Sequence, residues 1–214
     1  ALLARTMAGL DHAPAVLLSG SAIGFYGDRG DEALDESSTT GTGFLAEVCQ
    51  AWEAATAPAD EAGIRVVHLR TGIVLSPAGG ALKKLLPLFR FGVGGRFGNG
   101  RQWQSWISLP DEVGAIAHLL TAEVSGPVNL TAPGAVTNRD FTKVLASTLH
   151  RPAVLPVPRF APRLLLGRDR ADSLLFTGQR VLPGVLQSSR YEFLHPTLGV
   201  ALAELLSKSP APRK

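Results

Sequence analysis

Apolar positions along the chain change their spacing several times, and each change marks a new element. Short, continuous apolar runs at residues 15–18 and 64–75 are typical of strands buried on both faces, as in parallel sheets. Apolar residues at helical spacing follow at residues 44–57 and 80–91. This order of strand, helix, strand and helix, with no hairpin signal between the strands, predicts βαβ units in a parallel sheet.

The helix predicted at residues 44–57 has a distinct apolar stripe. Phe44, Val48, Ala51 and Ala55 fall on one face, and Pro58 follows the helix. Further along, the spacing predicts a helix at 110–123, a strand at 128–132, a helix at 137–149 and a last helix within 191–206.

The composition of the chain changes between the helix predicted at residues 80–91 and the helix predicted at 110–123. Residues 92–106, GVGGRFGNGRQWQSW, are rich in glycine and hold two tryptophans. Glycines let a backbone pass close to a ligand, and aromatic rings supply flat pocket walls. A glycine-rich connecting loop with two packed tryptophans is an equally good interpretation.

Composition and charge argue against several classes of function. The 214-residue chain has a net charge of +3, and its basic residues are scattered, with no run longer than Lys83 and Lys84, so we expect no nucleic-acid partner. No apolar stretch reaches the roughly 18 residues of a membrane span, so we expect no membrane partner. The one cysteine, Cys49, fits a reducing compartment and a cytoplasmic protein. The histidines show no metal-ligand spacing, and no metal site is predicted.

The stretch at residues 19–30, SGSAIGFYGDRG, carries the first candidate chemistry. It follows a predicted buried strand, and in α/β proteins ligands bind beyond the carboxyl ends of strands. A serine hydroxyl there can hydrogen-bond a substrate, and Tyr26 can act as an acid or base if its pKa is lowered. The alternative is that the serines are turn or cap residues and that Tyr26 packs.

Several motifs in chain order resemble those of the extended short-chain dehydrogenase/reductases. VLLSGSAIGFYGD resembles the segment that ends their fourth strand, where a serine is followed by YG a few residues later. VVHLRTGIVLSP is similar to their next strand, whose end lies against the nicotinamide, and GNGRQWQSWISLPDEVGAIAHLL to their substrate-side stretch. The series GFLAEVCQAWEAA, LRTGIVLSPAGGAL, FGVGGRFGNGRQ, GPVNLTAP and GQRVLP is similar to the epimerase-like branch, sometimes called sugar-nucleotide epimerases.

This resemblance implies an α/β fold with a Rossmann-like parallel sheet, incomplete at its N-terminus, and a small α+β C-terminal domain on the substrate side. Residues 1–92 would form the last part of the dinucleotide-binding domain and residues 93–214 the substrate-side region, with the chain returning to the sheet between about residues 106 and 136. The resemblance also implies NADP or NAD as cofactor, with NADP slightly favoured, and a small polar or nucleotide-linked substrate.

The resemblance implies roles for individual residues as well. Ser21 matches the family's catalytic serine best, with Ser19 as the alternative, and Tyr26 is the nearby phenol. Arg70 would orient a cofactor phosphate or carboxamide, or would form a structural ion pair instead. Arg101 would bind a phosphate or carboxylate, or is a solvated arginine. The implied cofactor-binding residues are Ser19, Gly20, Arg70, Gly72, Ile73 and Val74, and the implied substrate-binding residues are Asn99, Arg101 and Trp106.

Two departures from the family pattern limit what the resemblance implies. The family opens with a strand and a Gly-rich turn that holds the cofactor pyrophosphate at a helix N-terminus, and this sequence has no such motif. We therefore expect the strand at residues 15–18 to lie on an open sheet edge and the chain to self-associate through it. The family's catalytic tyrosine and lysine would fall on Phe44 and Val48, or on Leu45 and Cys49, and none of these can replace them.

The sequence leaves two hypotheses for the function. The first is an NAD(P)-dependent oxidoreductase or epimerase, of which this chain alone would turn over little or no substrate. The second is a non-enzymatic NADP(H)-binding or regulatory module that keeps the fold and has lost the Tyr/Lys proton-transfer pair.

Overall fold

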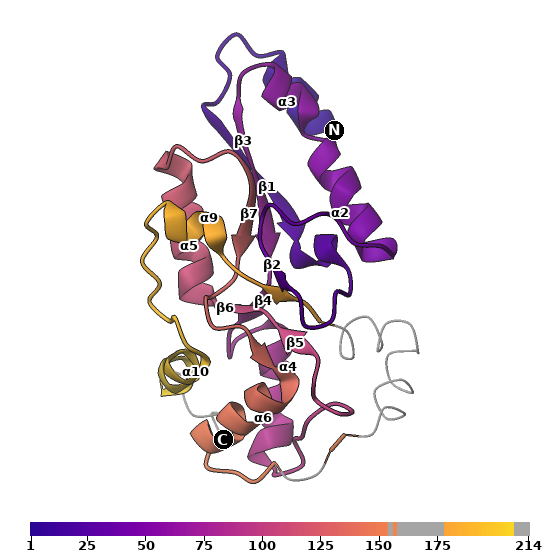
Figure 1. The fold of residues 1–214 in the computed structure, drawn as a ribbon. Coiled ribbons are helices and arrows are strands. Elements are labelled where there is room, and N and C mark those ends of the chain that lie inside the picture. The colour runs from indigo at the N-terminus through magenta and orange to yellow at the C-terminus, as the bar shows by residue number, and fades with distance from the viewer. Residues whose placement is uncertain (154–155, 158–177, 208–214) are drawn as a thin grey trace.

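A parallel sheet forms the centre of the molecule (Figure 1). The computed structural model describes residues 1–153, 156–157 and 178–207. Within them, β1 (Val16–Ala22), β3 (Arg65–Thr71) and β7 (Gly126–Leu130) pair in parallel in the order β1-β3-β7. The predicted α/β fold with a parallel sheet is confirmed.

Helices cover both faces of this sheet (Figure 1). On one face, Leu17 and Val66 pack against apolar residues of two short helices, α1 and α3, and α2 lies beside them. On the other face, Val67 and Val128 pack against α5 and the short helix α9. The bounds of these helices are α1 Leu2–Ala8, α2 Phe44–Ala54, α3 Ala57–Glu61, α5 Leu109–Thr121 and α9 Gly184–Ser188.

The two crossover connections of the sheet have opposite hands. The connection from β1 to β3 passes through α2 and α3 on one face, and that from β3 to β7 passes through α5 on the other. Both connections move one strand onward in the same direction, so they cannot both be right-handed. Right-handed crossovers are nearly universal, and one of these two is therefore an exception.

Short strand pairs and three helices form a second part of the molecule beyond the carboxyl end of β3 (Figure 1). Its core includes Leu75, Leu82, Trp106, Leu145 and Leu202. The pairs are β2 (Ala33–Leu34) with β9 (Arg180–Val181), β4 (Ile73–Leu75) with β6 (Trp106–Ser108), and β5 (Trp103–Gln104) with β8 (Val136–Thr137). The helices are α4 (Gly80–Arg90), α6 (Asn138–Thr148) and α10 (Leu198–Ser207).

Two predicted strand boundaries are wrong. The strand predicted at residues 15–18 runs on to Ala22, so Ser19 and Ser21 are strand residues and not part of a following loop. The strand predicted at 64–75 is broken at Gly72, after which β4 pairs with a different partner, β6. A Cβ atom at Gly72 would lie 2.7 Å from the Ser105 carbonyl oxygen, and this close approach explains why glycine marks the break.

The helix predicted at 44–57 ends at Ala54, and Pro58 lies in the first turn of α3, where proline is tolerated. The predicted apolar stripe of α2 is not its buried side. Ala46 and Cys49 are the buried residues of this helix, whereas Phe44 is 76% exposed.

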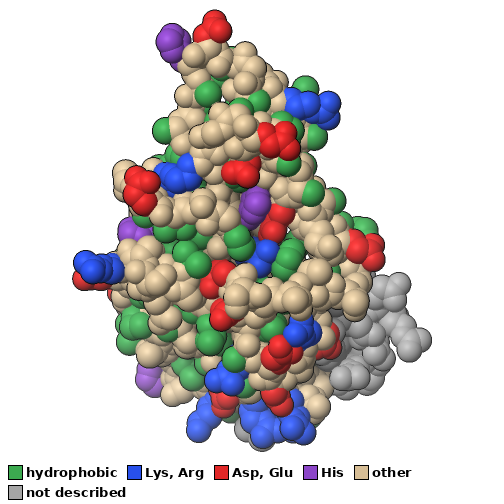
Figure 2. Space-filling model, turned by 45° about the horizontal axis from the view of Figure 1, so that its top comes forward, with side chains coloured by type: hydrophobic (Ala, Val, Ile, Leu, Met, Phe, Trp, Pro, Cys, Tyr) green, Lys and Arg blue, Asp and Glu red, His purple; other side chains and the backbone are tan. Residues whose placement is uncertain are grey.

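The surface carries charged side chains of both signs. Figure 2 shows Lys and Arg mostly near the lower end of the view, mixed with Asp and Glu, and hydrophobic side chains scattered between them. Among the helices that the structure describes, none has the length and apolar character needed to cross a bilayer.

The edge of β1 leads to a prediction about association. In the described part of the chain, β1 pairs with β3 on one side and has no partner strand on the other. We expect light scattering to give a mass above 22.5 kDa that rises with concentration, because an open strand edge pairs with a second chain. Gly20→Lys should lower this association without unfolding the protein, because Gly20 is exposed and a Cβ atom added there would meet no other atom within 4 Å. A monomer at all concentrations would contradict the prediction.

Candidate functional site

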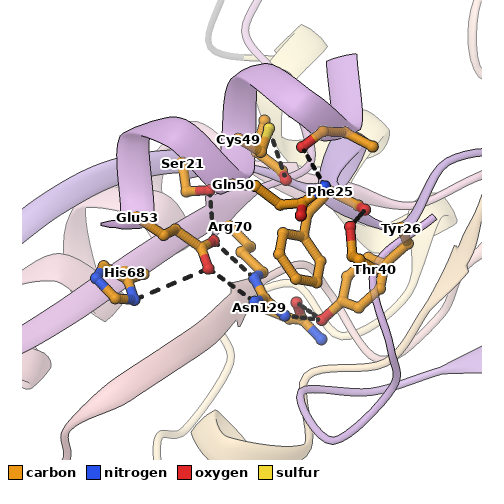
Figure 3. Close-up of polar contacts among 12 residues, drawn as sticks. Ser21, Phe25, Tyr26, Thr40, Cys49, Gln50, Glu53, His68, Arg70 and Asn129 are labelled. Carbon is orange, nitrogen blue, oxygen red and sulfur yellow. Dashed lines mark hydrogen bonds and ion pairs between the residues drawn. The ribbon is translucent and has the colours of Figure 1, made fainter. Parts of the chain in front are cut away.

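The strand register places a polar row at the carboxyl end of the sheet. Ser21 of β1 is the register partner of Arg70 of β3, and Arg70 is the register partner of Asn129 of β7. Aligned residues of paired strands point to the same face, and here it is the face covered by α2. Figure 3 shows this row together with Glu53 of α2 and Tyr26, which follows β1.

A buried ion pair lies at the middle of the row. Arg70 donates from Nε and Nη2 to the two carboxylate oxygens of Glu53 at 2.9 and 2.8 Å. The Ser21 hydroxyl donates to the same carboxylate at 2.7 Å, and the Arg70 guanidinium lies 3.5 Å from the centroid of the Phe25 ring. Burial acts to raise the pKa of Glu53, but the hydrogen bonds from Arg70 and Ser21 outweigh it and lower the pKa below its ordinary value. Glu53 is therefore a carboxylate at neutral pH.

Tyr26 closes the row from η1 (Ile23–Tyr26), the 3₁₀ turn that follows β1. Its hydroxyl donates to Asn129 Oδ1 at 2.8 Å and accepts from Arg70 Nη1 at 3.0 Å. The side chain has no exposed surface, and burial raises the pKa of Tyr26 above its ordinary value although Arg70 and Asn129 act to lower it. Both capacities of the hydroxyl are used inside the protein, which favours the packing interpretation of Tyr26 over the catalytic one.

His68 lies two residues before Arg70 in β3, on the same face of the sheet. The Thr56 hydroxyl donates to the Glu53 carbonyl at 2.7 Å, so it accepts from Nε2 of His68 at 2.9 Å. The other ring nitrogen, Nδ1, lies 3.9 Å from a carboxylate oxygen of Glu53. Burial lowers the pKa of His68, and the imidazole is therefore uncharged at neutral pH.

The sequence reasoning missed Glu53, His68 and Asn129. A signal for Glu53 exists, because it lies four residues after the buried Cys49 and so on the buried side of α2. A charged residue at such a position needs a partner of opposite charge, and Arg70 in an apolar strand is the matching residue. No comparable signal marks Asn129, whose place depends on the register of β3 and β7.

Some of the residues predicted to bind a cofactor are accessible at the end of the sheet, and others are turned inward or closed off. Gly20 is exposed with open space around it, and Ser19, Ile73 and Val74 are half-buried near the same end of the sheet. Arg70 points inward to Glu53. Its contacts are therefore those of a structural ion pair and not those of a residue that orients a cofactor phosphate or carboxamide. The side-chain position of Gly72 is closed off by the Ser105 carbonyl. A flat group could rest on the bare backbone of Gly20, and in this respect the residues present fit a nicotinamide ring.

The residues predicted to bind substrate also differ in their exposure to solvent. Asn99 and Arg101 are exposed, and the Asn99 side chain accepts a hydrogen bond from the Arg101 backbone N–H at 3.0 Å. Trp106 has no exposed surface, packs in the core of the second part, and donates from its indole nitrogen to the Gly134 carbonyl at 2.8 Å. Trp106 is therefore a core residue and not an exposed pocket wall, because β6 buries it against β4 and α4.

The helix positions expected for a tyrosine and a lysine hold no group that can replace them. Leu45 is exposed, and Cys49 is buried with its sulfur 3.6 Å from the Ala22 carbonyl oxygen. Phe44 is exposed and Val48 half-buried. Among the described residues, no group of three or more His, Cys, Asp or Glu side chains is placed to hold a metal ion.

A second buried carboxyl lies on the opposite face of the sheet. Glu112, in the first turn of α5, accepts a hydrogen bond from the Thr71 hydroxyl at 3.0 Å. Its other oxygen is buried without a hydrogen-bond partner among the described residues. Burial raises the pKa of Glu112 to about 7, and the bond from Thr71 offsets only part of this effect.

Comparison with known proteins agrees with this architecture. A family model described as a domain of unknown function (DUF1731) matches residues 157–205, of which the structure describes mainly β9, α9 and α10. The Mycobacterium bovis protein named Epimerase family protein Mb2239 is 48% identical over 193 residues, which are 90% of this chain and 64% of the relative. The chain thus spans less than two thirds of that relative's length.

Two solved structures match nearly the whole chain. The crystal structure of the human epimerase family protein SDR39U1 (isoform 2) with NADPH has a TM-score of 0.85 and 30% identity, and it covers 97% of this chain and 70% of that chain. A nucleoside-diphosphate sugar epimerase from Corynebacterium glutamicum has a TM-score of 0.78 and 39% identity, covering 96% of this chain and 40% of that chain. The fold is that of the extended short-chain dehydrogenase/reductases. Within them, the chain belongs to the epimerase family.

The buried ion pair gives a prediction about stability. Arg70→Ala should lower the free energy of unfolding in urea by about 3–5 kcal/mol, because it leaves the Glu53 carboxylate buried and unpaired. Arg29→Ala is the matched control, since Arg29 forms a similarly short pair with Glu32 on the surface, and its loss should cost less than about 1 kcal/mol. Equal losses in the two variants would show that the Arg70 pair is no more important than a surface pair.

Glu112 gives a prediction about pH. Its folded-state pKa of about 7 lies above the ordinary 4.5, so the folded state holds this proton more tightly than the unfolded state. The associated stability is present below pH 4.5 and is lost as the pH rises through 7. Glu112→Gln removes this loss and should be more stable than the parent protein at pH 8, by up to about 3 kcal/mol, with little difference at pH 4.5.

The control for Glu112 is Glu123→Gln, at an exposed position just beyond the same helix. It should change neither the stability at pH 8 nor its pH dependence. Urea unfolding curves that show no gain for Glu112→Gln at pH 8 would mean that Glu112 is already ionised at no cost.

Proposed function

We propose that this chain, when joined to the part of its relatives that it does not span, binds NADP(H) and acts as an epimerase-like or reductase-like member of its family on a small polar or nucleotide-linked substrate. The observation that carries the proposal is the likeness of 97% of the chain, at a TM-score of 0.85, to a family member whose structure was determined with NADPH. The open backbone at Gly20 supports it, because a flat ring can approach the end of β1 there.

The residues that would hold the nicotinamide end of the cofactor come from two neighbouring segments. Ser19 and Gly20 belong to β1, and Ile73 and Val74 begin β4 directly after β3. Bound there, the nicotinamide supplies a hydride donor or acceptor. The chain's own contribution is an apolar wall from Ile73 and Val74 that excludes water, and the bare backbone of Gly20 that allows close approach.

The Ser21 hydroxyl would accept, and not donate, a hydrogen bond from a ligand. Its proton is donated to the Glu53 carboxylate, so the lone pairs of its oxygen remain for other partners. A ligand that reaches Ser21 would therefore meet an acceptor, which favours a ligand hydroxyl or N–H over a carbonyl. Glu53 and Arg70 hold this orientation through their own bidentate pair.

A second candidate function is a non-enzymatic NADP(H)-binding or regulatory module. The observation that favours it is the absence of a proton-transfer group at Leu45 and Cys49, together with the buried and fully bonded hydroxyl of Tyr26. The two candidates share the cofactor and differ in whether a hydride leaves it. Two assays separate them. A reductase gives net oxidation of NADPH with a carbonyl substrate, which absorbance follows, whereas an epimerase interconverts two epimers of the substrate and leaves the cofactor in its starting redox state, so its product is analysed directly; the non-enzymatic module gives neither result.

The cofactor itself is tested by calorimetry. We expect the 214-residue chain to bind NADPH weakly or not at all, because its sequence holds no Gly-rich turn to cradle the pyrophosphate. A fusion that adds the part of the Mycobacterium bovis relative left uncovered by the match should bind NADPH in the micromolar range or tighter. Gly20→Lys in that fusion should weaken binding about tenfold or more, by filling the open end of β1. A folded fusion with no affinity for NADPH would refute the proposed function.

A further inference from the structure

Two buried polar atoms in the second part of the molecule have no hydrogen-bond partner among the described residues. They are Nε of Arg96, in the glycine-rich segment at 92–106, and Oε1 of Gln104, in β5. Buried donors and acceptors in folded proteins are almost always bonded, because an unmade hydrogen bond costs the full desolvation of the group. One of these atoms is a donor and the other an acceptor, so a ligand that carries both kinds of group would satisfy them.

The strand β5 turns the Gln104 side chain toward the loop that carries Arg96. Trp103 and Gln104 point to opposite sides of the strand, because side chains alternate along it. The Trp103 indole nitrogen donates to a carboxylate of the loop that follows η1, at 2.7 Å. Gln102, two residues before Gln104 and so on the same side of the chain, donates from its side-chain amide to the Phe97 carbonyl at 3.3 Å. Gln104 therefore lies on the side of β5 that faces Phe97 and its neighbour Arg96.

The start of α6 holds this loop in place. The Phe97 backbone N–H donates to Oδ1 of Asn138 at 2.8 Å. The Asn138 backbone N–H donates in turn to the Gln102 carbonyl at 2.9 Å. The N–H of the next residue in α6, Arg139, donates to the Gly100 carbonyl at the same distance. The loop is thus fastened at three points, and little conformational entropy would be lost on binding a ligand.

Three arginines without a counter-ion surround Gly100. A Cβ atom at Gly100 would lie 3.2 Å from Cδ of Arg96 and 3.2 Å from Cβ of Arg139, and Arg101 follows directly in the chain. Among the described residues, no carboxylate forms an ion pair with any of the three. The carboxylate of Asp140, the acid nearest to them in sequence, is bonded to the N-cap hydroxyl of α6. The local field is therefore positive, and the planar fork of a guanidinium matches a phosphate or carboxylate.

We propose that Arg96, Arg101, Arg139 and Gln104 form a binding site for a phosphate-bearing sugar, either free or nucleotide-linked. The phosphate accepts hydrogen bonds from Arg96 and its neighbours, and a sugar hydroxyl donates to Oε1 of Gln104. Solvated surface arginines do not explain the pattern, because Nε of Arg96 is shielded from water as well as unpartnered. The proposal narrows the substrate of the proposed function and rests on that function for the reaction, although the binding step can be measured without the cofactor.

The test is an NMR titration of the 214-residue chain with glucose 1-phosphate, which carries a phosphate and several hydroxyls. We expect a dissociation constant in the millimolar range or tighter, with affinity falling as the salt concentration rises. Glucose and inorganic phosphate should each bind about tenfold more weakly or worse, because each lacks one half of the contacts. No binding of glucose 1-phosphate, or equally tight binding of inorganic phosphate, would overturn the proposal.

Variants separate the site from general charge and stability. Arg96→Gln should weaken the binding of glucose 1-phosphate about tenfold or more, because it removes a charged donor. Arg5→Gln removes the same charge from an exposed position in α1 and should leave the binding unchanged. If Arg96→Gln fails to fold, Arg101→Gln at an exposed position gives the same comparison. Equal effects of the loop variant and Arg5→Gln would refute the site.

Gln104→Met tests the acceptor by itself. It keeps the length of the side chain but cannot accept from a hydroxyl, so it should weaken the binding of glucose 1-phosphate and leave that of inorganic phosphate unchanged. It should not lower the free energy of unfolding in urea, because the atom that it replaces has no partner in the free protein. A loss of stability with no change in sugar binding would show that Gln104 has only a structural role.

NADPH is a second source of phosphate groups, and the fusion protein distinguishes it. Arg96→Gln should leave the NADPH affinity of the fusion unchanged, because the residues proposed to hold the nicotinamide lie at the end of β1 and the start of β4. Loss of NADPH binding in this variant would assign the arginines to the cofactor and overturn the proposal. A fusion that binds no NADPH would refute the proposed function instead, and the titration with glucose 1-phosphate would still decide whether the site exists.

Discussion

The buried ion pair of Arg70 and Glu53 is the interaction on which the rest of the site depends. It joins the middle strand of the sheet to α2 through two hydrogen bonds of 2.8 and 2.9 Å. The same two groups hold Ser21 and Tyr26, so that the ends of β1 and β3, the turn after β1, and α2 are fixed by one network. Because charges inside a protein are costly unless fully bonded, each of these partners constrains the others.

This network also decides which groups remain for chemistry. Arg70 and Tyr26 are buried, and their polar atoms form hydrogen bonds with one another, with Glu53 and with Asn129. Ser21 keeps the lone pairs of its oxygen, while the open face of the site is provided by backbone and apolar side chains around Gly20 and Ile73. A site of this kind is suited to positioning the proposed cofactor, and a proton for the proposed reaction would come from a group other than Tyr26.

The sequence was sufficient for the order and type of the main elements, because buried strands and amphipathic helices each leave a periodic signal. The motifs around Ser21 and Arg70 were also sufficient for the family, which the 48% identity to a mycobacterial relative supports. The buried face of α2 was mispredicted, because periodicity identifies an apolar stripe without saying which side is covered, and Phe44 proved exposed. The row of Ser21, Arg70 and Asn129 could not be predicted, since it depends on the register of three strands distant in sequence.

A double-mutant cycle on Ser21 and Tyr26 tests most directly whether the row acts as one network. The hydrogen bonds of the row link these two side chains through Glu53 and Arg70 and not directly to each other. Urea unfolding of Ser21→Ala, Tyr26→Phe and the double variant gives their coupling energy. The network predicts a coupling above about 0.5 kcal/mol, whereas additivity within about 0.3 kcal/mol would show that the two ends of the row are independent.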